Sequence, residues 1–265
     1  MADTRDDAVA PERAGATDRD GAPGRPGATD RDGASGPHDP GPGRLRPRTP
    51  AADAPLRDDL RARVAALLDA PAGAGAPPRR LLGIAGAPGA GKSTLSAQVL
   101  AAFPGRCVVV PMDGFHLAQT ELERLGRADR KGAPDTFDAA GYVALLRRLR
   151  DPVPGETVYA PEYRRDLRNG VAGAIAVPAD VPLVVTEGNY LLLDQHGFAP
   201  VRDLLDACWF VDLPEEVRAE RLVARHELFG KPPAAAYAWT HGPDQRNADL
   251  VAATRSRADA VVTVD

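Results

Sequence analysis

The stretch LLGIAGAPGAGKSTLSAQ, residues 81–98, contains a short apolar run, a glycine-rich turn and the start of a predicted helix. Within it, GAPGAGKS fills every fixed position of a phosphate-binding loop. The glycines let backbone N–H groups point inward, and the following helix N-terminus adds unpaired donors. Lys92 supplies a cation for the outer phosphates, and the Ser93 hydroxyl can ligate Mg²⁺. We therefore predict a nucleotide site whose cofactor-binding residues are Gly86, Ala87, Pro88, Gly89, Ala90, Gly91, Lys92, Ser93 and Thr94.

Composition excludes several other classes of protein. The 265 residues carry a net charge of −4, so no global basic field attracts nucleic acid or anionic lipid. No apolar run approaches the roughly 20 residues that cross a bilayer, and the N-terminus lacks the apolar core of a signal peptide. Cys107 and Cys208 lie in apolar, strand-like runs and are predicted to be buried free thiols. We expect a cytoplasmic protein with no nucleic-acid or membrane partner.

Residues 1–52 differ in composition from the rest of the chain. Pro, Gly, Ala, Asp and Arg dominate them, and ATDRDGA occurs twice, at 16–22 and 28–34. Such a segment buries too little apolar area to offset its ordering entropy. We predict a disordered low-complexity tail at 1–52 and one folded domain at 53–265.

The folded part alternates apolar, strand-like runs with amphipathic stretches. Strands are predicted at 81–85, 106–113, 181–187, 208–213 and 260–264, and helices at 56–70, 92–103, 201–206, 214–229, 233–240 and 244–253. A further helix follows Asp138, its predicted N-cap. Residues 114–134 read as a polar insertion, and 156–177 as an excursion with hairpin character. Continuous apolar strands between helices predict an α/β sheet covered by helices on both faces.

Two predicted strands end in carboxylates, at the edge where ligands of open parallel sheets bind. Asp113 and Glu187 would join the phosphate-binding loop at this edge. One can help Ser93 to hold Mg²⁺, and the other can accept a proton from an attacking hydroxyl. The alternative is that both carboxylates only cap the turns that follow. We favour the functional interpretation and predict Ser93, Glu187 and Asp113 as metal-binding residues.

Basic and aromatic side chains could complete the site. Arg218, Arg221 and Arg225 share one face of a predicted helix, which is either a solvated surface or a lid over the transferred phosphoryl group. Of these we prefer Arg221 and Arg225. The candidate residues for an acceptor pocket lie in or beside the insertions and are His116, Arg127, Lys131, Tyr159 and Tyr163.

Six motifs together resemble those of a known group of enzymes. In chain order they are GAPGAGKST, PMDGFH, RKGAPDTFD, VYAPEY, VVTEGNYLLL and RLVARH. They resemble the uridine kinase/pantothenate kinase/phosphoribulokinase group of P-loop kinases, nearest its nucleoside/nucleotide kinase branch. The resemblance implies the P-loop NTPase fold, a five-stranded parallel core, and ATP and Mg²⁺ as cofactors. It also implies that Asp113 serves as base or metal-linked carboxylate, that Glu187 helps hold Mg²⁺, and that Arg221 and Arg225 contact phosphates.

The leading hypothesis is therefore an ATP- and Mg²⁺-dependent phosphotransferase that acts on a hydroxyl of a small metabolite. In it, Lys92, Asp113, Glu187, Arg221 and Arg225 form the catalytic set. A nucleoside, a pantothenate-like alcohol or a sugar alcohol would be the acceptor. The alternative is a nucleotide-binding regulatory module without transfer activity. The sequence leaves a homodimer open.

Overall fold

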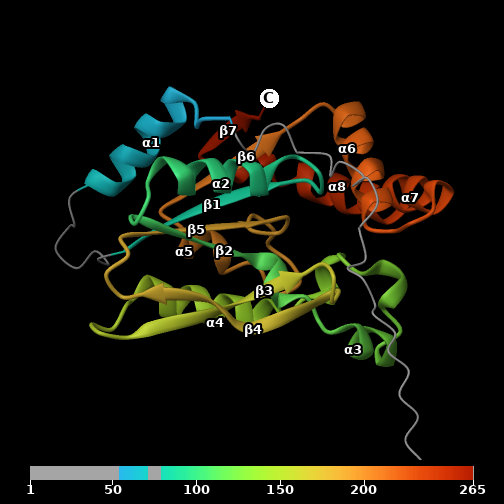
Figure 1. The fold of residues 1–265 in the computed structure, drawn as a ribbon, viewed down its shortest axis with the longest axis horizontal. Helices are drawn as coiled ribbons and strands as arrows, with labels where there is room; N and C mark the ends of the chain where they lie inside the picture. Colours follow the sequence, from blue (N-terminus) through green and yellow to red (C-terminus); the bar gives the residue numbers. More distant parts are fainter. Residues whose placement is uncertain (1–53, 71–78, 265) are drawn as a thin grey trace, which may run out of the picture. The chain divides into compact units, whose positions relative to one another are not determined.

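Five parallel strands form the central sheet of the computed structural model, which describes residues 54–70 and 79–264 (Figure 1). In spatial order they are β2 (Cys107–Pro111), β5 (Leu183–Gly188), β1 (Arg80–Gly86), β6 (Ala207–Asp212) and β7 (Ala260–Thr263). Every residue of β5 is buried, as is every residue of β1 after Arg80. Burial on both faces explains why these strands are continuous apolar runs without alternation. The predicted five-stranded parallel α/β core is confirmed.

Helices cover both faces of this sheet. On one face lie α1 (Asp58–Asp69) and α2 (Lys92–Ala102), and on the other α4 (Ala139–Arg150), α5 (Val201–Leu204) and α8 (Gln245–Ala252). Figure 1 shows α1 and α2 on the side of the sheet opposite to α4. Each face therefore has its own apolar core, as the alternation of strands and helices predicts.

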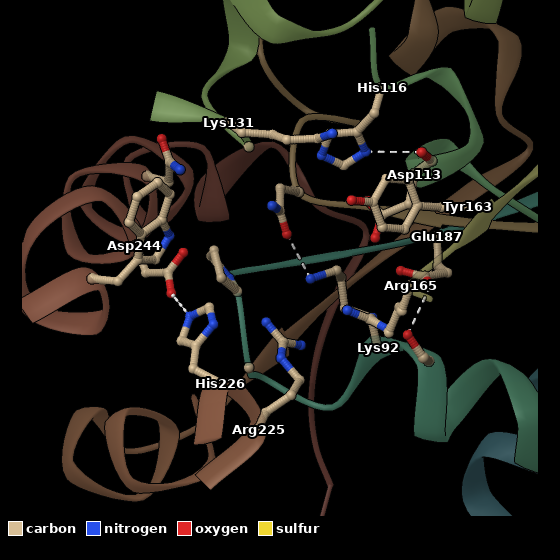
Figure 2. Close-up of a pocket in the computed structure, with 17 residues that line it drawn as sticks. Lys92, Asp113, His116, Lys131, Tyr163, Arg165, Glu187, Arg225, His226 and Asp244 are labelled. Atoms are coloured by element: carbon tan, nitrogen blue, oxygen red, sulfur yellow. Dashed lines mark hydrogen bonds and ion pairs between the residues drawn. The ribbon is translucent and has the colours of Figure 1, made fainter. Parts of the chain in front are cut away.

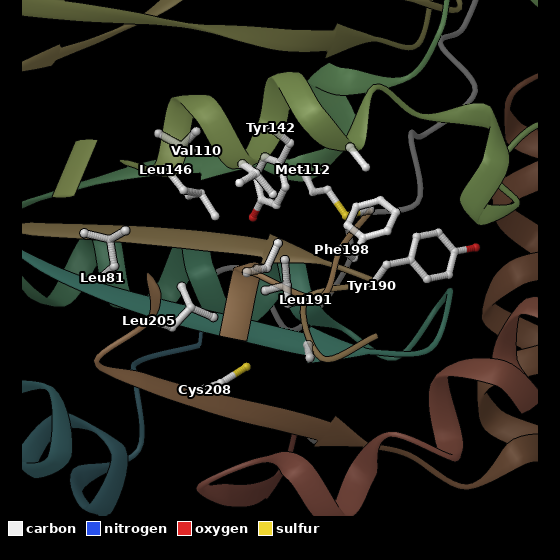
Figure 3. Close-up of a cluster of buried hydrophobic side chains, with 14 of the residues drawn as sticks. Leu81, Val110, Met112, Tyr142, Leu146, Tyr190, Leu191, Phe198, Leu205 and Cys208 are labelled. Carbon is white, nitrogen blue, oxygen red and sulfur yellow. The ribbon is translucent and has the colours of Figure 1, made fainter. Parts of the chain in front are cut away.

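The core beneath α4 contains a polar link that fixes this helix to the sheet. Tyr142 and Leu146 of α4 point toward the sheet among apolar side chains (Figure 3). The Tyr142 hydroxyl lies 2.7 Å from Oγ1 of Thr186, which donates to the Val110 carbonyl at 2.7 Å. This link satisfies two buried hydroxyls and joins α4 to β5 and β2. Asp138 accepts a hydrogen bond from the Gly141 N–H at 2.8 Å, so its predicted N-cap role is confirmed.

Strand register places the ends of β1, β2 and β5 at one edge of the sheet. Glu187 pairs with Ile84 on one side and with Pro111 on the other. Asp113 follows β2 by two residues, in a 3₁₀ turn at Met112–Phe115. Both carboxylates consequently lie beside the loop that follows β1, as expected from the parallel topology.

Two insertions extend this edge. The first contains α3 (Gln119–Arg124), and the second is an antiparallel hairpin of β3 (Thr157–Arg164) and β4 (Asn169–Pro178), which confirms the predicted hairpin. The hairpin packs on the Asp113 turn without intervening side chains. A Cβ added to Gly114 would lie 2.3 Å from the Pro161 carbonyl oxygen. The position of the hairpin is therefore coupled to that of Asp113.

The C-terminal third supplies helices beside the same edge. They are α6 (Glu215–Leu228), α7 (Pro233–Trp239) and α8, and a π-helical turn at Thr240–Asp244 joins the last two. π-Helical turns are rare in proteins as a whole, but those that occur lie frequently at functional sites.

Three further expectations concern the chain as a whole. The predicted tail at 1–52 lies outside the described residues, and the domain boundary at residue 53 stays a prediction. Cys107 and Cys208 are buried and unpaired, as predicted. Within residues 54–70 and 79–264, no helix has both the length and the apolar character needed to cross a bilayer.

Candidate active site

The phosphate-binding loop connects β1 to α2 and depends on glycine geometry. Gly89 and Gly91 have φ values of 83° and 101°, which side chains disfavour. A Cβ on Gly89 would also lie 2.7 Å from Cγ of Leu222, so α6 packs directly against the loop. Thr94 is half-buried in the first turn of α2. The loop therefore presents its backbone at a helix N-terminus, an arrangement that binds anions.

Lys92 is held inside this loop. Its Nζ donates to the carbonyls of Gly86 and Ala87 at 2.9 and 3.1 Å, and to Oδ1 of Asn189 at 2.7 Å. Burial lowers the pKa of Lys92, whereas the charges of Glu187 and Asp113 act in the opposite direction. The ammonium group is thus positioned by three acceptors at the point where phosphates would lie.

Ser93 and Glu187 form the second pair at the loop. The Ser93 hydroxyl donates to Oε1 of Glu187 at 2.8 Å. Burial raises the pKa of Glu187, and repulsion from Asp113 raises it further. Among the described residues no cluster of three or more His, Cys, Asp or Glu side chains could hold a metal ion. A hydroxyl and a carboxylate nevertheless fit Mg²⁺, which takes few protein ligands and completes its shell with phosphate and water.

His116 supports the turn that carries Asp113. Its Nδ1 lies 2.8 Å from the Asp113 carbonyl oxygen, which can only accept, so Nδ1 bears the proton. The imidazole lies between the rings of Phe137 and Tyr163, with centroid separations of 4.0 and 4.8 Å. Burial lowers the pKa of His116, which favours the neutral ring with an unprotonated Nε2.

A single pocket unites the loop, the insertions and the C-terminal helices (Figure 2). The loop and strand ends contribute Pro88, Gly89, Lys92, Ser93, Asp113, Glu187 and Asn189. The insertions contribute His116, Lys131, Gly132, Tyr163 and Arg165. The C-terminal helices contribute Arg225, His226, Trp239, Asp244 and Asn247. Segments separated by more than a hundred residues of sequence therefore meet around one cavity.

The wall formed by the C-terminal helices is polar. Nε2 of His226 lies 2.7 Å from Oδ2 of Asp244, and Asp244 and Asn247 are both buried. Burial lowers the pKa of the Arg225 guanidinium, and the nearby charge of Arg165 lowers it further. Across the pocket, Nζ of Lys131 donates to the Arg168 carbonyl at 2.6 Å. Figure 2 shows Arg225 and His226 on the α6 side of Lys92, and Lys131 extending toward His116.

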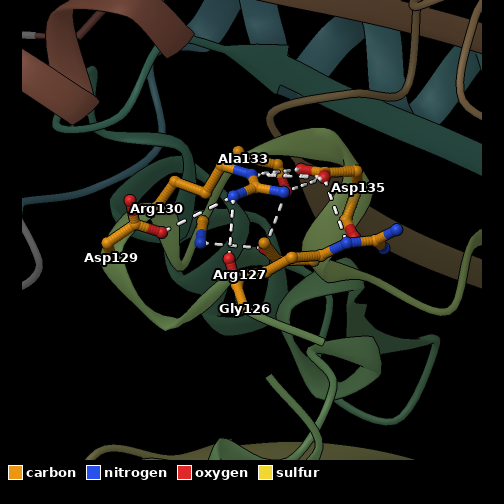
Figure 4. Close-up of polar contacts among 8 residues, drawn as sticks. Gly126, Arg127, Asp129, Arg130, Ala133 and Asp135 are labelled. Carbon is orange, nitrogen blue, oxygen red and sulfur yellow. Dashed lines mark hydrogen bonds and ion pairs between the residues drawn. The ribbon is translucent and has the colours of Figure 1, made fainter. Parts of the chain in front are cut away.

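Among the residues predicted for the acceptor pocket and the two preferred arginines of the lid, three lie away from the pocket lining. Arg127 donates to the Asp135 carbonyl at 2.7 Å and pairs with its carboxylate at 3.4 Å, and Arg130 binds the same carboxylate (Figure 4). Tyr159 is 59% exposed on the hairpin, because strand alternation turns it outward. Arg221 is exposed on α6, where its Nη1 would lie 3.9 Å from a Cβ on Gly91. It lies beside the outer side of the loop.

Sequence reasoning missed several lining residues. Asn189 lies two residues after Glu187, the last residue of the predicted strand, so its position at the sheet edge was detectable. Arg165 directly follows β3 and stands two residues after Tyr163, which was itself a predicted pocket residue. Trp239, Asp244 and Asn247 carry no local signal, because the π-helical turn determines their direction.

Comparisons with known proteins agree with this geometry. Residues 81–228 match the family described as phosphoribulokinase / uridine kinase. The ATP-dependent kinase-like protein notR' of Aspergillus versicolor is 32% identical over 152 residues, covering 54% of this chain and 88% of that protein. A pantothenate kinase of Halalkalibacterium halodurans is 33% identical over 159 residues, covering 56% and 49%.

A solved structure extends the likeness over more of the chain. It is that of a proposed fructose transport system kinase from Silicibacter sp. TM1040, which superimposes with a TM-score of 0.67 at 36% identity. The match covers 77% of this chain and 97% of the other. The chain therefore belongs to the phosphoribulokinase/uridine kinase family of P-loop kinases.

Proposed function

We propose that the protein transfers the γ-phosphoryl group of ATP to a hydroxyl of a small metabolite, with Mg²⁺ as cofactor. One observation carries this proposal: the Asp113 carboxylate lines the same pocket as Lys92 and the Ser93–Glu187 pair. A site that only binds a nucleotide has no use for an additional carboxylate facing the phosphate end. This observation favours a transferase over a regulatory module without transfer activity.

The donor half is built on the loop. Backbone N–H groups at the start of α2 and the Lys92 ammonium would hold the β- and γ-phosphates. The Ser93 hydroxyl and Glu187 would hold Mg²⁺, which when bound neutralises charge on the phosphate oxygens. Arg225 would contact the transferred group from α6, and Arg221 would approach the nucleotide from outside the loop.

Asp113 would activate the acceptor. In the transfer, the acceptor oxygen forms a bond to the γ-phosphorus while the bond to the β–γ bridging oxygen breaks. ADP leaves with that electron pair, and the acceptor proton passes to the Asp113 carboxylate. His116 would maintain the geometry, because its Nδ1–H holds the Asp113 carbonyl.

The acceptor would bind between the insertions and the C-terminal helices. His116, Lys131 and Tyr163 line one side of that space, and Asp244 and Asn247 line the other. Five polar groups suit a small molecule with several hydroxyls or amides. Relatives are named for pantothenate and fructose transport, which supports a pantothenate-like or sugar alcohol alongside a nucleoside.

A panel of such alcohols, assayed for acceptor-dependent ADP release, tests the proposal. We expect Asp113→Asn to lower kcat by about 10²- to 10⁴-fold while leaving Mg·ATP affinity nearly unchanged. Lys92→Ala should lose both turnover and affinity. Asp129→Asn is the matched control, since Asp129 is 81% exposed on the insertion. Unchanged acceptor-dependent turnover in Asp113→Asn would refute the assignment.

A further inference from the structure

Two consecutive arginines with different surroundings stand where β3 ends and the hairpin turn begins. Arg164 forms a bidentate ion pair with Asp166, at 3.0 and 2.8 Å, on the exposed side of the turn. Arg165 lines the pocket instead, as does Tyr163 two residues before it. Arg165 lies just beyond β3, as the first residue of the hairpin turn. Figure 2 shows Arg165 near Lys92 and Glu187.

Arg165 also contacts the helix on the other side of the cavity. Its guanidinium carbon lies 5.5 Å from the ring centroid of Phe229, the C-cap residue of α6. A cation over an aromatic face is attracted by the ring quadrupole. Arg165 remains exposed, and this contact fixes its guanidinium against the end of α6. The side chain thus bridges the hairpin and α6.

Three positively charged side chains, those of Arg165, Lys92 and Arg225, line the same pocket. Arg165 lies close enough to Lys92 and Arg225 to lower the pKa of both. Among the residues that the structure describes, none of the three forms an ion pair with a carboxylate within 4.0 Å, whereas Arg164, Arg127 and Arg130 all do. Like charges brought together from a loop, a hairpin and a helix repel one another. A bound anion between them would turn this repulsion into attraction.

We propose that Arg165 binds the transferring phosphoryl group, as a second guanidinium opposite Arg225. This inference rests on the proposed function. Arg165 acts while the γ-phosphorus–oxygen bond to ADP breaks and the bond to the acceptor oxygen forms, with the acceptor proton passing to Asp113. It stabilises the charge on the equatorial oxygens and exchanges no proton or electron pair itself.

Because Arg165 lies on the hairpin, its position depends on how the hairpin is placed. Tyr163 lines the pocket two residues before Arg165 on the same hairpin, and the hairpin packs on the Asp113 turn at Gly114. A bound acceptor that positions the hairpin therefore also positions Arg165. Transfer to water, which makes no contact with Tyr163, would lack this positioning.

The test measures the affinity of Mg·ADP with fluoroaluminate, a mimic of the transferring group. Trp239 lines the pocket and provides a fluorescence signal, with calorimetry as a second measurement. We expect Arg165→Met to weaken fluoroaluminate-dependent binding on the order of 10²-fold or more. The affinity for Mg·ADP alone should stay within about twofold, and Arg165→Lys should restore part of the loss.

Two controls separate this role from a structural one. Arg164→Met removes the same charge from the neighbouring position and should change fluoroaluminate affinity by no more than about twofold. Phe229→Ala removes the stacking contact but not the charge, and should cost about two- to fivefold. A loss in Phe229→Ala equal to that in Arg165→Met would overturn the proposal, because a hairpin–helix contact would then explain it.

The outcomes also separate this inference from the kinase assignment. Wild-type protein that binds Mg·ADP with fluoroaluminate, together with an unchanged Arg165→Met variant, would refute only the role of Arg165. Wild-type protein that does not bind Mg·ADP would refute the kinase proposal and this inference with it. Urea unfolding of each variant tests whether the substitutions on the hairpin and at the end of α6 leave the fold intact.

Discussion

Replacing Gly89 by alanine tests whether α6 rests on the phosphate-binding loop. The new Cβ would lie 2.7 Å from Cγ of Leu222 and 3.1 Å from the Arg218 carbonyl oxygen, both on α6. Gly89 also has a φ of 83°, where an alanine costs about 1 to 2 kcal/mol. Displacing α6 to relieve the contact adds about 1 to 3 kcal/mol of overpacking.

Gly155→Ala is the matched control for the backbone contribution. Its φ is 79°, nearly that of Gly89, and nothing lies within 4 Å of its added Cβ. Both variants lose the same unfolded-state entropy, so that contribution cancels in the comparison. The difference in unfolding free energy, from urea titrations with equal m-values, should therefore be about 1 to 3 kcal/mol and report the α6 contact alone.

The same variant should change the site. Displacing α6 moves Arg225 and His226 away from Lys92, so Gly89→Ala should weaken Mg·ATP binding while Gly155→Ala should not. Equal destabilisation of the two variants would refute the inference that α6 is supported by the loop. Unchanged nucleotide affinity in a Gly89→Ala protein that is selectively destabilised would refute the link between that support and the site.

Three further predictions concern buried polar groups. Burial lowers the pKa of His116, so the unfolded chain binds its proton more readily, and unfolding free energy should fall as pH drops below 6.5; His116→Phe should flatten this dependence in urea titrations. Arg79 is 1% exposed and donates to three backbone carbonyls, at the ends of α4 and β4 and ahead of β5. Arg79→Met should therefore cost about 3 kcal/mol in the same titrations, whereas Arg106→Met at a half-exposed ion pair should cost under about 0.5. Burial raises the pKa of Cys107, and raises that of Cys208 to about 12, so neither thiol should react with a disulfide reagent until the protein unfolds.

Local pattern and parallel topology were enough to predict the donor half of the site. The loop geometry is encoded by its own glycines, and a parallel sheet brings the residues after its strands to one edge. Asp113, Glu187 and Lys92 therefore met as expected without any knowledge of side-chain packing. Even Asn189, which sequence reasoning passed over, follows from the same rule.

The acceptor half was predicted less well, because competition between neighbouring side chains decides it. Arg127 and Lys131 belong to one basic cluster in sequence, yet Asp135 binds Arg127 and leaves Lys131 to the pocket. The charge of these side chains alone does not indicate which of them faces the pocket. Asp244 and Asn247 depend on a π-helical turn, and neither composition nor periodicity marks such a turn.

The donor half of the site was easier to predict than the acceptor half because the two halves are built on different parts of the fold. Donor residues stand at the ends of buried strands, where β5 is enclosed by β1 and β2, so their displacement would disturb the core. The hairpin buries Val158, Ala160 and Val177 in the core but leaves Tyr159 and Leu167 more than half exposed. Substitutions there cost little stability. On the proposed function, a change at the pocket-facing Tyr163 of the hairpin would alter which hydroxyl is presented to Asp113, while the phosphate-binding loop and the strand ends stay in place.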